Sequence, residues 1–145
     1  MSTPESKLIG INVSGIQARA ALIDQHGTLI NTKVAEVAPK QLIPQLAAMV
    51  EELGSRSSIA AIGVAIPGLV NRQTDRVIAP RDLPSTMVED LHGQLMRATD
   101  LRVELENDAN AAAYGEYKVG AGRGARRLVD LLHGVFMDTY LARFP

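Results

Sequence analysis

Apolar and polar positions alternate in three short segments near the start of the chain. These segments span residues 7–13, 18–24 and 29–37, and turns containing Gly15 and Gly27 separate them. Alternation with a period of two, together with many Ile and Val residues, is typical of β-strands. Parallel neighbours need crossovers of about a dozen residues or more, so these short connections predict an antiparallel meander.

The pattern then changes to helices and strands in alternation. In chain order we predict a helix at 39–56, a strand at 58–66, a hairpin at 69–80, a helix at 85–100, a strand at 101–105 and a helix at 108–119. The strand at 58–66 is apolar throughout, which favours burial on both of its faces. Gly54 sits where the first helix would stop, and Ser85 is a possible cap of the second helix. The order as a whole predicts an α/β domain with one mixed sheet, in which antiparallel strands precede parallel ones.

Composition narrows the classes of function. The formal net charge is -1 and no basic run occurs, so we expect no nucleic-acid partner. The chain has no cysteine and only three histidines, so disulfides are excluded and we expect no zinc or other metal site formed by this chain alone. The first residues do not resemble a secretory signal and no apolar run is long enough to cross a bilayer, so we expect a cytoplasmic protein without a membrane partner.

Polar residues follow two of the predicted strands at their carboxyl ends, where α/β sheets favour ligand binding. Gly68 follows the first of these strands, and Asn107 and Asp108 follow the second. In a functional interpretation, Asp108 accepts a proton from an attacking hydroxyl while Asn107 and the Gly68 backbone hold the polyol that carries it. In the alternative interpretation, Asp108 only caps the alanine-rich helix that follows. The two roles are compatible, and the pattern does not decide between them.

The turn between the first two strands is a second candidate site. It reads "NVSGIQ" from Asn12 to Gln17, and its glycine allows backbone N–H groups to approach an anion while Ser14 adds a donor. The same residues also suit a plain hairpin turn without any ligand. The sequence therefore leaves a phosphate cradle and a simple turn as alternatives.

Three stretches of the chain resemble the amino-terminal lobe of the ROK family, which comprises sugar kinases and sugar-responsive repressors. They read "LIGINVSGIQARAALID", "AAIGVAIPGLVNRQTDRVIAPRDLPS" and "LRVELENDANAAAYGEYKVGAGRGARRLV". The resemblance implies an actin-like, ribonuclease-H-like lobe with a mixed sheet and helices on both faces. It also implies a hexose ligand and ATP-dependent phosphorylation of that hexose with Mg²⁺, in the manner of the family's glucokinases.

The resemblance also assigns roles to individual residues. Asp108 matches the family's catalytic base, and Asn107 and Gly68 match positions that contact the sugar. In "APRDLPS", Asp82 or Arg81 stands where an Asn before Leu-Pro is usual, so Asp82 is a candidate sugar contact.

The phosphate turn departs from the family pattern, which begins with an Asp, has two glycines and ends in Thr-Lys. In this chain those places are occupied by Asn12, Ser14, Gly15, Ile16 and Gln17. A carboxylate, a hydroxyl and a cation are therefore missing, and phosphoryl transfer depends on positioning and on neutralising charge. We expect the turn to be degenerate and the chain alone to have little or no kinase activity. A non-catalytic sugar-sensing domain, related to the family's transcriptional regulators, is the alternative function.

The resemblance suggests a boundary inside the chain. We expect residues 1–129 to form the amino-terminal lobe and residues 130–145, where the family would continue into a second lobe, to be a divergent tail. A frameshift or truncation would explain such a tail, and one amphipathic helix formed by a natural short tail is the alternative. A face left without its second lobe would be covered in a homodimer, so we also expect a dimer.

Overall fold

The computed structural model describes residues 5–120, 123–124, 127–133 and 138–144. The chain forms two compact units, Met1–Glu106 and Asn107–Pro145, and each has its own internal architecture. Among the described residues, no helix combines the length and the apolar character that a membrane span requires.

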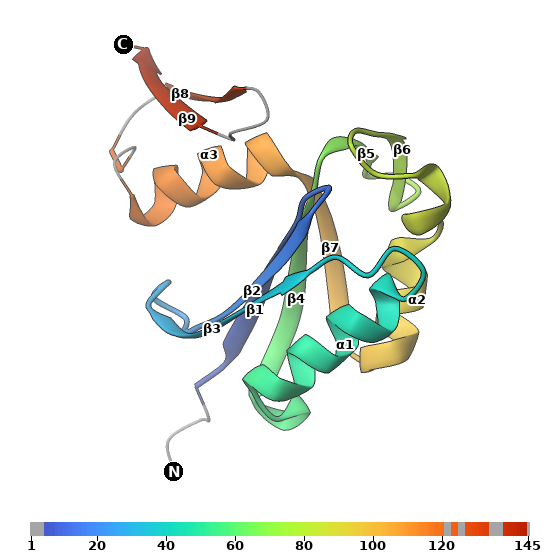
Figure 1. The fold of residues 1–145 in the computed structure, drawn as a ribbon. Helices are drawn as coiled ribbons and strands as arrows, with labels where there is room; N and C mark the ends of the chain where they lie inside the picture. The colour runs from blue at the N-terminus through green and yellow to red at the C-terminus, as the bar shows by residue number, and fades with distance from the viewer. Residues whose placement is uncertain (1–4, 121–122, 125–126, 134–137, 145) are drawn as a thin grey trace. The chain divides into compact units, whose positions relative to one another are not determined.

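A five-stranded sheet, with the strand order β3-β2-β1-β4-β7, forms the centre of the first unit (Figure 1). Its strands are β1 Lys7–Val13, β2 Gln17–Ile23, β3 Leu29–Glu36, β4 Ile59–Ile66 and β7 Arg102–Asn107. β1 and β2 are antiparallel, as are β2 and β3, whereas β1 and β4 are parallel. The predicted meander and the predicted mixed sheet are therefore both confirmed.

Two helices, α1 Leu42–Leu53 and α2 Leu91–Thr99, lie on the same side of this sheet and contact each other (Figure 1). α1 ends at Gly54, as its sequence pattern predicts. The predicted start of α2 is wrong, because Ser85 only begins a short 3-10 turn. The residue before α2 is Asp90, whose φ of 46° is in the left-handed region, where Asp is among the few side chains that are tolerated.

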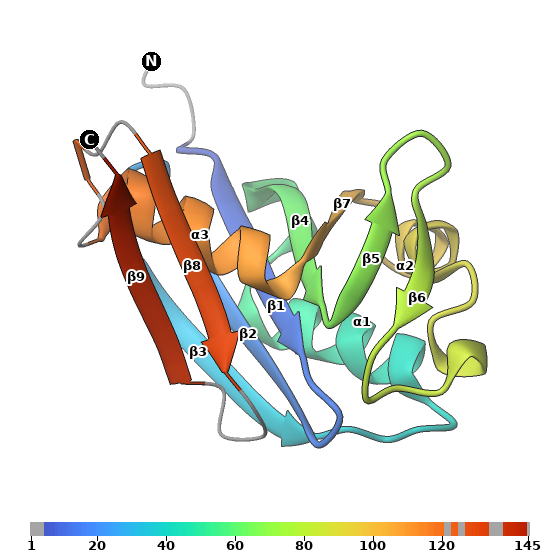
Figure 2. The ribbon, with the colours of Figure 1, turned by 90° about the horizontal axis from the view of Figure 1, so that it is seen from above.

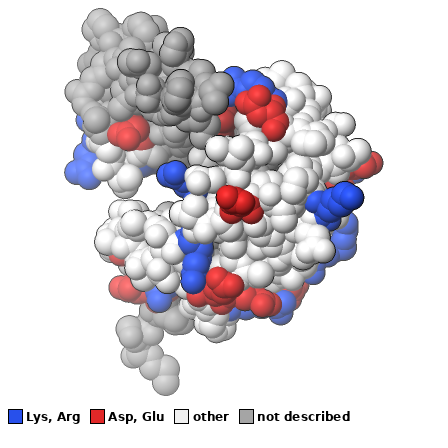
Figure 3. Space-filling view, in the orientation of Figure 1, with Lys and Arg blue, Asp and Glu red and all other residues white. Residues whose placement is uncertain are grey.

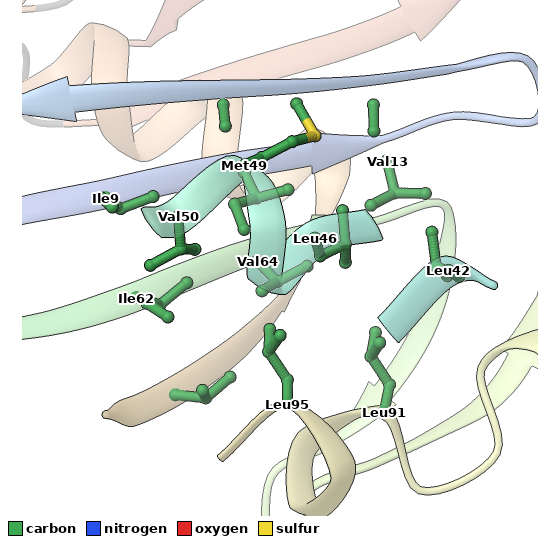
Figure 4. Packing of buried hydrophobic residues seen from close by; sticks show 14 of the residues in the cluster. Ile9, Val13, Leu42, Leu46, Met49, Val50, Ile62, Val64, Leu91 and Leu95 are labelled. Atoms are coloured by element: carbon green, nitrogen blue, oxygen red, sulfur yellow. The ribbon is translucent and has the colours of Figure 1, made fainter. Parts of the chain in front are cut away.

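The core of the first unit lies between the helices and one face of the sheet (Figure 4). Its most deeply buried large side chains are aliphatic: Ile9, Leu46, Ile62, Ile66, Leu91 and Leu95. Burial alternates along β4, contrary to the prediction of a strand covered on both faces. Its core-facing positions carry Ile and Val, whereas Gly63 between them is exposed. The continuous apolar run arises because the other positions of β4 are Ala and Gly, which are apolar but small.

β3 is an edge strand of the sheet, and it is irregular. Its pairing with β2 shifts register between Leu29 and Asn31, which leaves Ile30 as an extra residue in a bulge. The backbone N–H of Thr32 donates to the Asn31 side-chain oxygen at 2.8 Å. A β-bulge bends a strand and disturbs the row of backbone groups on its edge.

A short antiparallel hairpin connects β4 to the rest of the first unit, as predicted. It consists of β5 Gly68–Asn71 and β6 Arg76–Pro80 (Figure 2). Val70 and Val77 pack against the core from one face of the hairpin. The hairpin is thereby anchored to the core at the point where β4 ends.

The second unit contains α3 Asp108–Val119 and an antiparallel pair of strands, β8 Arg127–His133 and β9 Asp138–Phe144. The bounds of α3 agree with the prediction. The alternative prediction of one amphipathic helix in the tail is wrong, because its described residues, 130–133 and 138–144, lie in the strands β8 and β9. Tail residues such as Thr139 and Tyr140 favour strands over helices.

Candidate functional site

The first unit brings the turn after β1 close to the loop after β6. A Cβ atom added to Gly15 would lie 2.8 Å from the backbone carbonyl oxygen of Asp82, so no larger residue fits there without movement. Asp82 itself has a φ of 62° and an exposed side chain that lies 3.7 Å from Arg81 Nε. Two segments that are distant in the sequence, and that the sequence marked as candidate ligand sites, are thus neighbours.

Gly68 lies at the junction of β4 and β5, where the backbone requires glycine. Its φ is +128°, and an added Cβ would lie 2.1 Å from the carbonyl oxygen of Ala79. Gly68 pairs with Pro80, and the Arg81 N–H donates to the Pro67 carbonyl at 2.9 Å. These contacts fix the path of the backbone at the carboxyl end of β4.

The turn from Ser14 to Gln17 is closed by the Ser14 side chain. Ser14 Oγ accepts the N–H of Gln17 at 3.0 Å and that of Ile16 at 3.4 Å. The same hydroxyl donates to the Gln17 carbonyl at 3.1 Å, and the Ser14 N–H also donates to that carbonyl at 2.8 Å. The serine predicted to add a donor for an anion is bonded within its own turn.

Arg19 is a polar residue beside this turn that the sequence analysis missed. Its Nη2 donates to Gln17 Oε1 at 3.2 Å, and it pairs with Asn12 across the two strands. A cation therefore lies next to a turn that lacks the lysine of the family pattern. The position of Arg19 was predictable from the strand register, because a hairpin whose turn is centred near Gly15 pairs residue 12 with a residue close to 19.

Glu106, the residue before Asn107 and Asp108, has an electrostatic partner in the first unit. Glu106 forms an ion pair with Arg72, which lies in the loop between β5 and β6. The pair joins the end of β7 to the tip of the hairpin. Glu106 therefore has a structural role that the sequence analysis did not assign to it.

Asn107 and Asp108 form the start of α3 in the second unit. Asn107 is the helix cap, because its Oδ1 accepts the N–H of Ala109 at 3.0 Å and that of Asn110 at 3.2 Å. Asp108 is only 6% exposed, and its Oδ1 accepts the Ala109 N–H at 2.9 Å. The N-cap residue of α3 is therefore Asn107, and the alternative interpretation, in which Asp108 is the cap, is wrong. A buried carboxylate in the first helical turn is stabilised by the N–H groups and the dipole there.

A hollow of about 320 Å³ lies elsewhere in the first unit. It is lined by Arg76, Val77, Ser85, Thr86, Val88, Glu89 and Asp90. The hydrogen bond from Arg97 at 3.1 Å, together with the charge of Arg76, lowers the pKa of the Asp90 carboxyl. The hollow contains none of the predicted site residues, and two of its charged groups, Arg76 and Asp90, lie 4.0 Å apart.

Charged residues of both signs are interspersed on the face of the molecule seen in Figure 3. Across the described residues, no three His, Asp or Glu side chains come together in a way that could hold a metal ion. The candidate residues form two separate clusters, one around Gly15 and Asp82 in the first unit and one at Asn107 and Asp108 in the second.

Comparison with known proteins adds an independent observation. A sequence model of the ROK family matches residues 8–134. A glucokinase from Streptomyces coelicolor is 34% identical over 128 residues, which are 87% of this chain and 40% of that enzyme. The chain thus spans about 40% of the length of this curated relative.

Solved structures show the same relationship. A ROK family glucokinase from Streptomyces griseus, in complex with glucose and AMPPNP, superposes with a TM-score of 0.76 at 28% identity, covering 83% of this chain and 39% of that one. An inorganic polyphosphate/ATP-glucomannokinase from an Arthrobacter species gives a TM-score of 0.73 at 26% identity, with 86% and 53% covered. The predicted actin-like α/β fold is confirmed.

Proposed function

The chain belongs to the ROK family, and on this premise we propose that it supplies the hexose-binding part of a glucokinase-like sugar kinase. The curated glucokinase that it resembles is more than twice as long, since the chain covers 40% of it. We therefore expect little or no phosphoryl transfer from this chain alone. The observation that carries the proposal is the buried carboxylate of Asp108 at the junction of a strand and a helix.

In this proposal Asp108 binds one hydroxyl of the sugar and accepts its proton. Asn107 is the cap residue, because its Oδ1 accepts two helix N–H groups, and it shares one of them, that of Ala109, with Asp108 Oδ1. The amide nitrogen of Asn107 is the donor that we assign to a second hydroxyl. A carboxylate held by a rigid helix start is well oriented for general base catalysis.

In the first unit, Gly68 and Asp82 are the residues that the family pattern assigns to the sugar. Gly68 is held in a conformation that other residues rarely adopt, and it offers backbone atoms without a side chain. Asp82 is exposed and replaces the asparagine of the family pattern. Because an Asp accepts hydrogen bonds but does not donate them when ionised, we expect the hexose preference to differ from that of relatives with Asn.

ATP and Mg²⁺ are implied by the family, but the turn from Ser14 to Gln17 does not fit a phosphate group. Its N–H groups at positions 16 and 17 are bonded to Ser14 Oγ, and Ile16 and Gln17 offer neither a hydroxyl nor a cation. We therefore assign no residue of this turn to ATP.

Isothermal titration with glucose tests the proposal. Asp108→Asn removes the carboxylate but keeps a residue of the same shape at the helix start. We expect it to weaken glucose binding at least about tenfold, which is the effect of losing one hydrogen bond to a charged group. Asp100→Asn, an exposed aspartate at the end of α2, is the matched control and should bind like the parent chain. Equal binding by the parent and Asp108→Asn would contradict the role of Asp108.

The closed turn favours a second candidate function, a sugar-sensing domain without catalysis. Such a domain would bind a hexose with an affinity that does not change when Mg²⁺ and ATP are added. A kinase lobe would instead show coupling between the sugar and the nucleotide. Glucose titrations with and without AMPPNP and Mg²⁺ distinguish the two, and strong coupling would exclude the sensing domain.

The expected homodimer, the cytoplasmic location and the lack of a nucleic-acid partner stay predictions. Sedimentation velocity at micromolar concentration tests the dimer. A single species with the mass of one chain would contradict it.

A further inference from the structure

The turn between β1 and β2 positions two backbone N–H groups as an anion site would. Those of Ile16 and Gln17 both point at one oxygen, Ser14 Oγ. A hydroxyl has one proton to donate and two lone pairs that accept. Ser14 uses all three, because it accepts both N–H groups and donates to the Gln17 carbonyl at 3.1 Å. The oxygen of the serine thus occupies the place that an oxygen of a bound anion would take.

Contacts outside the turn hold it in this closed form. The Val37 N–H donates to the Ile16 carbonyl at 3.0 Å. The backbone carbonyl oxygen of Asp82 lies close to Gly15, because a Cβ atom added to Gly15 would be 2.8 Å from that oxygen. These contacts restrict Gly15 and Ile16, so the N–H groups of the turn cannot easily move toward another acceptor.

We infer that Ser14 is a specificity-determining residue that excludes phosphate groups from this turn. An incoming phosphate would have to displace the hydroxyl from two N–H groups and leave it without its partners. The inference rests on the proposed function in one respect. The proposed relationship to ATP-dependent kinases identifies the excluded ligand as the polyphosphate chain of a nucleotide. Sugar binding at Asp108 does not depend on it.

Replacement of the hydroxyl tests this inference directly. Ser14→Ala removes the internal acceptor, whereas Ser14→Thr keeps a hydroxyl and serves as the matched control. The probe is sodium tripolyphosphate, and the readout is the amide NMR shifts of Gly15, Ile16 and Gln17 in the ¹⁵N-labelled full chain. In Ser14→Ala we expect saturable shifts at these amides, with an affinity at least about tenfold above that of the parent and of Ser14→Thr.

Amide hydrogen exchange of Ile16 and Gln17 without any anion supplies a second measurement. It should be about tenfold faster in Ser14→Ala than in the parent, because two N–H groups lose their acceptor. Equal tripolyphosphate binding by the parent and Ser14→Ala, or no gain in Ser14→Ala, would overturn the inference. If alanine disturbs shifts beyond the turn, Ser14→Gly repeats both measurements with the same expected results. Failure of this test leaves the glucose titrations with Asp108→Asn unaffected, so the two proposals can fail separately.

Discussion

The two faces of the five-stranded sheet differ in what they contribute to the molecule. On the face covered by α1 and α2, positions such as Ile62 and Val64 are buried and filled by branched side chains. On the opposite face, Gly10 and Gly63 pair across β1 and β4, and a Cβ added to either would meet no heavy atom within 4 Å. That open face also carries Asn12, beside the closed turn. Stability and candidate ligand chemistry are therefore separated between neighbouring residues of the same strands.

The largest effect is expected from truncating a side chain on the buried face. Ile62→Ala should lower the free energy of unfolding by about 2–5 kcal/mol, because it removes apolar contacts and leaves a cavity. Chemical denaturation followed by circular dichroism measures this change. A loss below about 1 kcal/mol would mean that the buried face does not carry the stability assigned to it.

Enlarging a side chain should have a smaller effect that also depends on the face. Ala20 is 2% exposed and faces the core, whereas Ala21 is half-buried on the other face. Ala20→Ile should destabilise the protein by about 1–3 kcal/mol through overpacking. Ala21→Ile is the matched control and should cost less than half of that in the same denaturation experiment. Similar losses in both variants would remove the distinction between the faces.

Acid should weaken the start of α2, one of the helices that cover the buried face. The Arg97 hydrogen bond lowers the folded-state pKa of Asp90, so this carboxylate stabilises the fold above its ordinary pKa of 3.8. The contribution is lost as the pH falls through the lower folded-state value. Thermal unfolding at several pH values should show a slightly smaller acid-induced loss in Arg97→Gln than in the parent. An identical pH dependence would show that this exposed contact does not support the helix.

The smallest effect is expected at Gly63, the residue next to Ile62, where the largest effect is expected. Gly63→Ala adds a methyl group to the open face, where nothing lies within 4 Å of it. It should change stability by less than about 1 kcal/mol, with a gain favoured because alanine restricts the unfolded chain. Denaturation under the conditions used for Ile62→Ala provides the comparison. A loss as large as that of Ile62→Ala would show that this face is packed after all.

Much of the fold follows from periodicity in the sequence. The meander, α1 with its end at Gly54 and α3 each depend on local patterns that long-range contacts do not override. The start of α2 was missed because the left-handed Asp90 depends on its surroundings, including Gly93, where a Cβ would lie 2.6 Å from the Asp90 carboxylate. The sequence did not predict alternating burial in β4, because Ala and Gly count as apolar in the pattern whether they are buried or exposed.

The candidate site was predictable as a set of residues but not as a set of bonds. Gly15, Gly68 and Asp108 stand out in the sequence, and the structure gives each a position that suits its residue type. The direction of the Ser14 hydrogen bonds could not be predicted, because a serine can point into its own turn or toward a ligand. The close approach of Asp82 to Gly15 depends on tertiary structure and leaves no local signal.

The irregular edge of β3 has a consequence for the chain in a crowded solution. Edge strands that expose apolar side chains are common starting points for intermolecular β-structure. β3 exposes two such side chains, Leu29 and Val34. The bulge at Ile30 interrupts the template, and Asn31 occupies the Thr32 N–H that a foreign strand would need. Residues that contribute little to the core are therefore expected to hinder the pairing of β3 with another chain.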